Sequence, residues 1–196
     1  MDTLNKAIKL ATQVHDGQKD KRGRPYILHC IEVMHQLNSF SSEECMYSNG
    51  MIDVDITPTV DLLMATKGED MLLSIAVLHD ALEDNYNNVP TDHVINGELF
   101  RHVNALTKKP DQKRTEYIRN LLIPEIKHDH TNWVEVIDKA TVAVVKYSDL
   151  TCNLRSIDLV PDSQTLKNRY TREKALLKKN IGSITTWFFE TEKGLH

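Results

Sequence analysis

Cysteine and long apolar runs are both scarce in this sequence of 196 residues. The three cysteines, Cys30, Cys45 and Cys152, form no CxxC pair and are odd in number, which argues against a disulfide framework and a cysteine-based zinc site. No apolar stretch approaches the roughly 18 residues that indicate a transmembrane helix. The N-terminal segment MDTLNKAIKLATQVH has no apolar core of the signal-peptide type. We therefore expect no membrane association and a reducing, cytoplasmic setting.

An excess of basic charge is also lacking. Lys and Arg number 24 against 28 Asp and Glu, a formal net charge of −4, which gives no general electrostatic reason for nucleic-acid binding. Hydrophobic residues make up 40% and charged residues 27% of the chain, which is typical of a globular protein rather than a disordered one. The length suits one domain, so we expect residues 1–196 to form a single unit and leave a homo-oligomer open.

Helical periodicity runs through most of the chain, whereas strand patterns are rare. Apolar spacing predicts helices over residues 2–17, 26–38, 70–84, 98–108, 114–126, 133–157 and 164–189. The segment 133–157 could form one helix or two. Residues 39–69 are polar and weakly periodic, so we expect an irregular insertion there, with a short strand or hairpin near 51–56 and a helical turn in 59–68. The predicted class is all-α, a helical bundle with this insertion.

The stretch VLHDALEDN, residues 77–85, places four ionisable side chains in an otherwise apolar segment. On the predicted helix, at about 100° per residue, His79, Asp80, Glu83 and Asp84 share one face and can converge on one site. Carboxylates that lie close together raise one another's pKa, and a divalent cation would relieve this repulsion. Imidazole beside carboxylates suits Mn, Fe, Zn or Co better than Ca or Mg. The alternative is an exposed acidic helix end, although helix C-termini disfavour negative charge.

A metal centre needs more ligands than His79 and Asp80, and two distant residues qualify. His29 lies in RPYILHC, on a predicted helix whose opposite side is apolar. Asp149 follows the apolar run ATVAVV, so its carboxylate should be partly buried, and a buried charge needs a partner or a metal. Taken singly, each residue also has an ordinary structural explanation at the edge of the core.

Three motifs in this order, HDGQKDKRGRPYILH, AVLHDALED and VVKYSDLTCNL, resemble the HD superfamily of metal phosphohydrolases. The nearest match is the RelA/SpoT-type hydrolase branch, which includes small stand-alone alarmone hydrolases. The resemblance runs from residue 7 to about residue 177. It implies an all-α HD-domain bundle, with metal ligands at His29, His79, Asp80 and Asp149 and Mn²⁺ as the usual ion.

The resemblance also implies a reaction. In the hydrolase branch the Glu-Asp pair after His-Asp is catalytic, and it falls on Glu83 and Asp84. The implied activity removes pyrophosphate from the 3' position of guanosine tetra- or pentaphosphate and leaves GDP or GTP. A metal ion lowers the pKa of its bound water towards neutrality, and Glu83, with Asp84 beside it, would accept or relay the proton.

Basic and polar side chains around these motifs are expected to hold the nucleotide. The expected set is Lys21, Tyr26, Lys146, Asn153, Arg155 and Ser156. Lys21 is the best match among the cations, and Tyr26 either lines the pocket or packs. For each of the cations the alternative is a surface charge in solvent.

The chain departs from the family pattern in ways that bear on substrate choice. Asp20 stands where longer alarmone enzymes carry an arginine that stacks on guanine, which leaves the choice of base open. Cys30 replaces the proline that usually follows the metal histidine. The segment between His29 and His79 is longer than in compact relatives; it could cap the site, select substrate, mediate association or be a tolerated surface insertion. No synthetase segment follows, so we expect the hydrolase alone.

Two alternatives to the guanosine alarmone hydrolase stay open. One is an HD phosphohydrolase acting on another nucleotide, such as an adenosine alarmone, a deoxynucleotide or NADPH. The other is a protein that binds a nucleotide without turnover, against which the intact Glu83–Asp84 pair argues. In each case the expected partner is a small nucleotide and not a nucleic acid.

Overall fold

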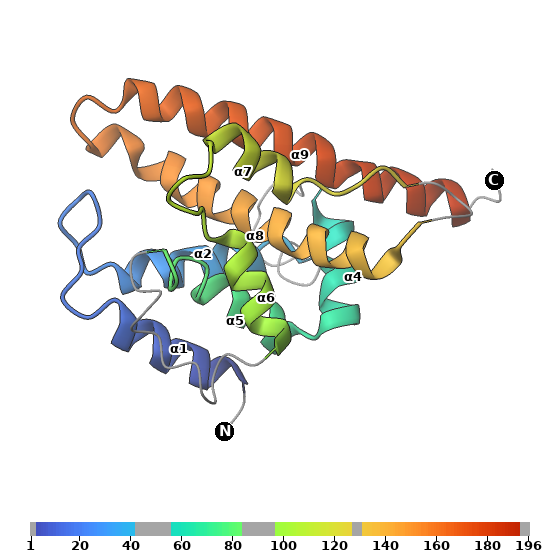
Figure 1. Cartoon of the computed structure of the whole chain (residues 1–196), viewed down its shortest axis with the longest axis horizontal. Helices are drawn as coiled ribbons and strands as arrows, with labels where there is room; N and C mark the ends of the chain where they lie inside the picture. Colours follow the sequence, from blue (N-terminus) through green and yellow to red (C-terminus); the bar gives the residue numbers. More distant parts are fainter. Residues whose placement is uncertain (1–2, 42–55, 84–96, 127–130, 193–196) are drawn as a thin grey trace.

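The computed structural model describes residues 3–41, 56–83, 97–126 and 131–192, which form an all-α helical bundle (Figure 1). In these ranges the only strand-like pairing is an isolated bridge between Lys19 and Pro25. The elements, in chain order, are α1 (Thr3–Val14), α2 (Ile27–Asn38), α4 (Thr57–Lys67), α5 (Glu69–Val77), α6 (Gly97–Leu106), α7 (Arg114–Leu121), α8 (Trp133–Ser156), the 3-10 helix η1 (Ile157–Leu159) and α9 (Gln164–Glu192). None of the described helices is long and apolar enough to cross a membrane.

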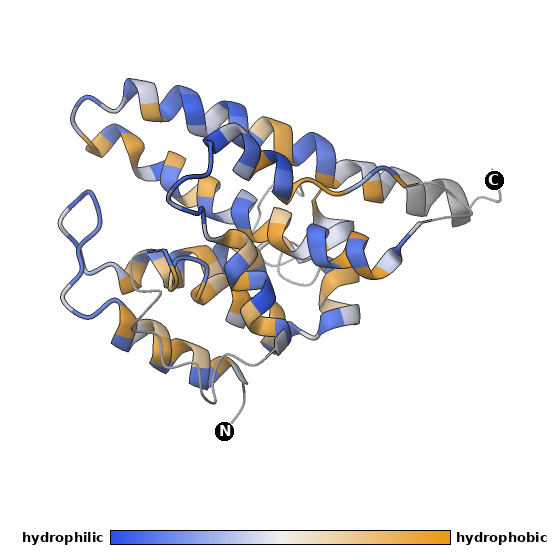
Figure 2. Cartoon of the chain, in the orientation of Figure 1, coloured by the Kyte–Doolittle hydropathy of each residue, from blue (hydrophilic) through white to orange (hydrophobic). Residues whose placement is uncertain are grey.

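Helix α8 is the centre of the bundle. It packs against α9 on one side and against α2, α4 and α6 on the other (Figure 1). Every residue from Ala140 to Cys152 is buried, and apolar residues dominate the stretch (Figure 2). A mainly apolar helix that is buried around its whole circumference belongs in a core rather than at a surface. The predicted segment 133–157 therefore forms one helix up to Ser156, with Asn132 accepting a hydrogen bond from the Glu135 amide at its start.

The sequence prediction was wrong for part of the insertion. Residues 57–67 form a regular helix, α4, that packs on α5, α8 and α9. Pro58 suits the first turn of a helix, and Gly68, with φ of 85°, ends it. Val60 and Leu63 are fully buried. Because several neighbours surround α4, its apolar residues do not form the single stripe that periodicity detects. The predicted strand at 51–56 falls almost wholly outside the described residues.

The predicted helix 70–84 is also wrong at its C-terminal end, because α5 stops at Val77. After this point the backbone bonds span three residues, as in Ala81 N to Leu78 O at 2.9 Å and Glu83 N to Asp80 O at 3.1 Å. Residues 78–83 are a turn. Leu78, Ala81 and Leu82 are buried, so core packing fixes this turn in place of another helical turn.

The other predicted helices are confirmed, with shorter ends in two of them. The helix expected over 114–126 stops at Leu121, because Pro124 lacks an amide donor and disfavours helical backbone before it. The helix expected over 2–17 stops at Val14, before Gly17 with φ of 72°. The helices at 26–38, 98–108 and 164–189 agree within the usual uncertainty of helix ends.

Candidate functional site

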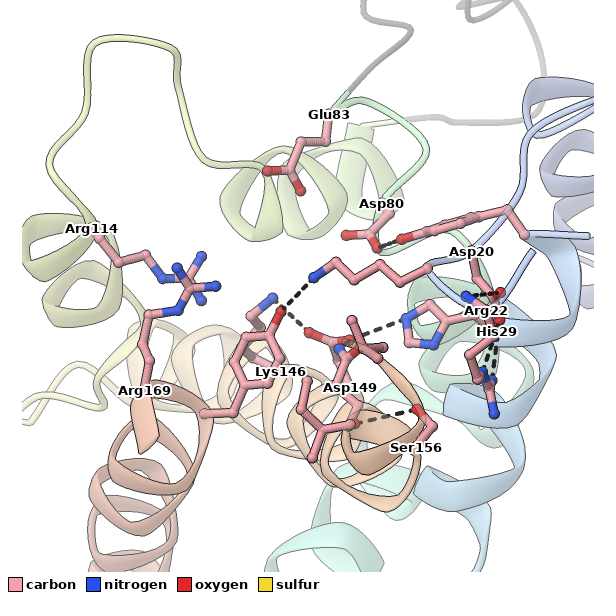
Figure 3. Close-up of a pocket in the computed structure, with 16 residues that line it drawn as sticks. Asp20, Arg22, His29, Asp80, Glu83, Arg114, Lys146, Asp149, Ser156 and Arg169 are labelled. Carbon is pink, nitrogen blue, oxygen red and sulfur yellow. Dashed lines mark hydrogen bonds and ion pairs between the residues drawn. The ribbon is translucent and has the colours of Figure 1, made fainter. Parts of the chain in front are cut away.

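A cavity of about 260 Å³ lies where α2, α8 and α9 meet the loop 18–26 and the turn 78–83 (Figure 3). Its volume is near the lower end of small-molecule sites, which begin at roughly 300 Å³. The cavity is lined mainly by charged and polar side chains: Asp20, Lys21, Arg22, Tyr26, His29, Asp80, Glu83, Arg114, Lys146, Asp149, Asn153, Ser156, Ile157, Val160, Arg169 and Tyr170. In Figure 3, His29 lies at one end and the guanidinium groups of Arg114 and Arg169 lie together at the other.

His79 and Asp80 occupy the turn after α5 rather than the helix itself. The buried His79 ring donates from Nδ1 to the Ala76 carbonyl at 2.8 Å, which directs Nε2 into the site. Nε2 lies 3.0 Å from Asp80 Oδ2 and 3.8 Å from Asp149 Oδ1. Within the described residues it nevertheless has no aligned hydrogen-bond partner. A histidine fixed by a backbone carbonyl through one nitrogen, with the other buried and unbonded, is typical of a metal ligand.

His29 and Asp149 reach the same point from two other helices. His29 Nε2, from α2, lies 3.1 Å from Asp149 Oδ1, on α8. The rings of His29 and His79 meet edge to face, with centroids 5.3 Å apart. One ligand atom from each of His29, His79 and Asp149 lies within 4.8 Å of the others. The structure therefore brings three of the four residues expected around a metal into one cluster. The fourth, Asp80, approaches that cluster through its 3.0 Å contact with His79 Nε2.

The electrostatics of this cluster favour an added positive charge. Burial alone would lower the pKa of His79, but Asp80 and Asp149 outweigh it and raise that pKa to about 9. Burial would raise the pKa of both carboxyls, yet His79 holds the pKa of Asp80, and Lys146 that of Asp149, well below the usual range. The ionised carboxylates thus retain a proton on His79. Two imidazoles and two carboxylates fit a divalent transition ion such as Mn²⁺ in place of that proton.

Lys146 and Asn153 line the cavity, but both are bonded to the Asp149 carboxylate. Lys146 Nζ lies 2.6 Å from Asp149 Oδ2, and Asn153 Nδ2 donates to Asp149 Oδ1 at 2.5 Å. The Asp149 carboxylate stabilises the buried ammonium group of Lys146. Burial alone would lower the pKa of Lys146, but Asp149 raises this pKa by more than burial lowers it. Both side chains were expected to contact the nucleotide. Their geometry shows that they first fix the orientation of Asp149.

The other expected residues have different placements. Glu83 is exposed on the turn and points into the cavity (Figure 3). Asp84 lies outside the described residues. Ser156 lines the cavity, although its hydroxyl donates to carbonyls three and four residues earlier, each at 3.3 Å. Arg155 is exposed and does not line this cavity.

Lys21 and Tyr26 both contact the cavity from the loop that precedes α2. Lys21 Nζ donates to the Tyr170 hydroxyl on α9 at 3.1 Å, a contact between residues 149 positions apart in sequence. Tyr26 donates its hydroxyl proton to Asp80 Oδ2 at 2.5 Å. Lys21 therefore connects the two walls of the cavity, and Tyr26 touches a candidate ligand rather than only packing.

Two cations at the far end of the cavity were missed by sequence reasoning. Arg114 forms a bidentate pair with Glu173, at 2.9 and 2.7 Å. Arg169 lies over the Tyr170 ring at 5.0 Å, and its buried Nε has no hydrogen-bond partner among the described residues. No local signal could have identified them, since one follows a polar connector and the other lies on an amphipathic helix. Only the packing of α7 and α9 along α8 brings them to the cavity.

Asp20, which departs from the family pattern, is the centre of the loop 18–26. Its Oδ1 accepts from the amides of Arg22 and Arg24 at 2.8 and 3.0 Å, and its Oδ2 from their Nε atoms at 3.2 and 3.0 Å. Glu32 binds both guanidinium groups from α2. The Asp20 side chain is 9% exposed. Its charge is therefore balanced within the loop, and Arg22 is carried to the cavity edge.

A second group of histidine and carboxylates lies away from this cavity. Glu98, His102 and Asp138 also place one ligand atom each within 4.8 Å of the others. Here Lys67 Nζ lies 2.5 Å from Glu98 Oε1 and 2.7 Å from Asp138 Oδ1. Both ring nitrogens of His102 are bonded, Nδ1 to the Glu98 carbonyl and Nε2 to Asp138. An ammonium group already occupies the position of a cation, so this cluster joins α4, α6 and α8 as a structural element.

Comparison with known proteins finds distant similarity to enzymes named for GTP chemistry. The chain is 23% identical over 161 residues to RSH1 of Arabidopsis thaliana, a chloroplastic protein provisionally assigned as a GTP diphosphokinase, covering 82% of this chain and 16% of that protein. It is 23% identical over 160 residues to a GTP pyrophosphokinase of Myxococcus xanthus, covering 81% and 17%. The chain thus spans about a sixth of the length of these relatives. No family model and no solved structure matches it. The similarities support a relation to the RelA/SpoT family.

Proposed function

We propose that this chain is an HD-type metal phosphohydrolase that removes pyrophosphate from the 3' position of guanosine tetra- or pentaphosphate. The observation that carries the proposal is one cavity with two chemically different ends. At one end two histidines and Asp149 converge, and Asp80 lies 3.0 Å from one of these histidines. Towards the other end lie Lys21 and Arg169, which have no carboxylate partner among the described residues. Hydrolysis of a phosphoanhydride-bearing nucleotide needs both an activated water and cations for the phosphates.

The ligand end would hold a divalent ion through His29, His79, Asp80 and Asp149, and we propose Mn²⁺ for it. When bound, such an ion polarises a phosphoryl oxygen and makes water a nucleophile near neutral pH. The protein's contribution is to fix the ligands in advance. The Ala76 carbonyl sets the His79 tautomer, and the carboxylate of Asp149 is held by neighbours on its own helix.

Glu83 is the proposed general base. It is an exposed residue of the same turn that carries His79 and Asp80, and it lines the cavity. We propose that its carboxylate accepts a proton from a water held beside those ligands. A carboxylate that accepts the proton of the attacking water contributes typically about 10²- to 10⁴-fold to rate. We propose that Asp84, which follows it, relays that proton.

Lys21 and Arg169 are the proposed primary contacts for the substrate phosphates. A cation that already has a carboxylate partner loses part of that interaction on binding phosphate, and Arg114 and Lys146 are both paired in this way. Lys21 and Arg169 have no such pair to give up among the described residues. The relatives are named for enzymes that act on GTP, which supports a guanine nucleotide as the substrate. Because the Asp20 carboxylate is balanced by two arginines, it adds no net negative charge at the cavity edge.

The test uses the full chain, stripped of metal with a chelator and reloaded with Mn²⁺. Guanosine tetraphosphate is added, and products are separated by anion-exchange chromatography. We expect GDP and pyrophosphate in equal amounts. Glu83→Gln should lower the rate by at least about 100-fold. Glu69→Gln, which removes an exposed charge at the first turn of α5, should keep the wild-type rate. Absence of both products with Mn²⁺ would contradict the proposal.

A second candidate reaction follows from the names of the relatives. Both are named for transfer of pyrophosphate to GTP. The same protein should therefore be incubated with GTP and ATP in the presence of Mg²⁺. Formation of AMP together with a more highly phosphorylated guanosine nucleotide would favour transfer over hydrolysis. A panel of adenosine, deoxy- and dinucleotide substrates in the hydrolysis assay separates base preferences, and binding without any product would indicate a nucleotide-binding protein.

A further inference from the structure

We propose that Tyr26 is a positioning residue of the metal site, whose hydroxyl fixes the carboxylate of Asp80. This inference rests on the metal site of the proposed function. It gives Tyr26 a role other than holding the nucleotide or filling space. It also makes a prediction about metal affinity that needs no substrate.

The contact is direct and spans two segments. Tyr26 is the residue before α2, and its hydroxyl lies 2.5 Å from Asp80 Oδ2, 54 positions away in sequence. A carboxylate has no proton to give, so the phenol donates and Asp80 accepts. The Tyr26 ring is held between His15 and His29, with centroids 4.9 and 5.4 Å away. The hydroxyl is therefore presented by a ring packed on both sides.

Core packing fixes the backbone of the turn that carries Asp80, but it does not fix the orientation of the Asp80 carboxylate. Helix α5 ends at Val77, so Asp80 projects from a turn rather than from a helix. Two of the other proposed ligands are each oriented by a hydrogen bond from within the protein. His79 donates to the Ala76 carbonyl, and Asp149 accepts from Lys146. Among the described residues, the Tyr26 hydroxyl is the one aligned hydrogen-bond donor to the Asp80 carboxylate.

The contact also selects which oxygen of Asp80 is available. The Tyr26 hydroxyl binds Oδ2, and His79 Nε2 lies on the same oxygen at 3.0 Å. The other oxygen of Asp80 points towards the cavity (Figure 3). Partners of this kind, which orient a metal ligand without touching the metal, typically change metal affinity about 10- to 100-fold when removed.

The test compares Mn²⁺ binding by wild type, Tyr26→Phe and Tyr170→Phe. Free Mn²⁺ is followed by its electron paramagnetic resonance signal, and the visible spectrum of bound Co²⁺ reports coordination geometry. Tyr26→Phe keeps the ring and should weaken Mn²⁺ binding by about 10-fold or more, with a changed Co²⁺ spectrum. Tyr170→Phe removes another hydroxyl group from the same cavity. This hydroxyl contacts Lys21 and none of the proposed metal ligands, so the variant should bind Mn²⁺ as wild type does.

A cycle with Asp80→Asn separates positioning from a general effect on folding. If Tyr26 acts through Asp80, the Tyr26→Phe change has no further effect on Mn²⁺ affinity in the Asp80→Asn background. An equal loss in both backgrounds, or wild-type Mn²⁺ affinity in Tyr26→Phe, overturns the inference. If Tyr26→Phe fails to fold, 3,5-difluorotyrosine at position 26 keeps the shape and strengthens the donor; unchanged Mn²⁺ affinity then overturns it. Wild type that binds Mn²⁺ but hydrolyses no nucleotide contradicts the proposed function and leaves this inference standing.

Discussion

Two clusters in this molecule use the same kinds of side chain for different ends. The His79 cluster comprises His29, His79, Asp80, Asp149 and Lys146, and the Lys67 cluster comprises Lys67, Glu98, His102 and Asp138. Each contains two carboxylates and one ammonium group, so each has one negative charge in excess when its histidines are neutral. A search by residue type alone would treat both as metal sites.

The difference lies in where the ammonium sits and in how much water reaches the carboxylates. Lys67 lies between its two carboxylates, at 2.5 and 2.7 Å. Lys146 contacts Oδ2 of Asp149, and Oδ1 of Asp149 faces the histidines. Glu98 and Asp138 are 39% and 29% exposed, whereas Asp149 is 4% exposed. Water screens the excess negative charge of the Lys67 cluster. The excess negative charge of the buried His79 cluster instead needs a proton or an ion.

Asp149→Asn should have the largest effect. It removes a proposed ligand and leaves the buried Lys146 without its carboxylate. We expect Mn²⁺ affinity to fall by more than about 100-fold, the upper end for residues that only support a ligand, with loss of nucleotide hydrolysis. Breaking a buried ion pair also costs about 3 to 5 kcal/mol of unfolding free energy. Metal binding and urea unfolding measure these separately.

The matched control is Asp138→Asn in the Lys67 cluster. This carboxylate is partly exposed and its ammonium keeps Glu98 as a partner. We expect wild-type Mn²⁺ affinity and a loss of about 1 kcal/mol or less. Equal losses of metal affinity in the two variants would show that the comparison is wrong.

The second prediction concerns stabilisation by metal. A ligand that binds only the folded state at about 100 times its Kd adds about 2.7 kcal/mol to the unfolding free energy. Mn²⁺ should therefore raise the Tm of wild type, and a chelator should reverse the rise. His79→Ala should abolish this increment, whereas His102→Ala should lower the starting Tm but keep the increment. Thermal melts with and without Mn²⁺ give the result, and an increment that survives in His79→Ala would place the metal elsewhere.

The sequence predicts the helices well where one face is apolar and poorly where tertiary contacts decide. Helix α4 was predicted only as a helical turn within an irregular segment, because its buried residues face several neighbours. The end of α5 was predicted wrongly because the His79 ring hydrogen-bonds to the Ala76 carbonyl in the last turn of the helix. Hydrophobic periodicity cannot show such a contact. Both errors arise from packing and side-chain bonding, which act on segments far apart in the chain.

The candidate ligands were predicted together, although part of the reason was wrong. One helical face was expected to carry His79 and Asp80, and the structure converges them through a turn. Their approach to Asp149 depends on the packing of α5 and α2 along α8. Arg114 and Arg169 could not be predicted, because a basic residue on an amphipathic helix carries no sign of the cavity that it will face.

The third prediction tests the Lys67 cluster by pH. Hydrogen bonding to Lys67 lowers the pKa of Glu98, and it lowers that of Asp138 despite the opposing effect of burial. Carboxyls with a depressed folded pKa stabilise the protein above their unfolded pKa of about 4 and lose that contribution as pH falls. Lys67→Met should therefore cost about 1 kcal/mol near neutral pH, since solvent screens both carboxylates.

The cost of Lys67→Met should shrink below about pH 4 as the carboxyls become protonated. Burial lowers the pKa of Lys67, but its two carboxylate partners raise this pKa by more than burial lowers it. The destabilisation caused by Lys67→Met should therefore also shrink as pH rises beyond the unfolded lysine pKa of about 10.4. Urea unfolding across this range gives the profile. A cost that stays constant in acid would mean that the ion pairs do not stabilise the fold.

Glu98→Gln should have the smallest effect and tests the role of water most directly. The glutamate side chain is 39% exposed, Lys67 keeps Asp138 at 2.7 Å, and the glutamine oxygen can still accept a hydrogen bond. Glu98 also lies in the first turn of α6, where a negative charge is worth about 0.3 to 1 kcal/mol. We expect a loss below about 1 kcal/mol that salt reduces further. A loss above about 2 kcal/mol that salt leaves unchanged would mean that solvent screens the Lys67 cluster as poorly as the buried His79 cluster. Solvent exposure would then no longer explain why one cluster takes a lysine and the other is proposed to take a metal.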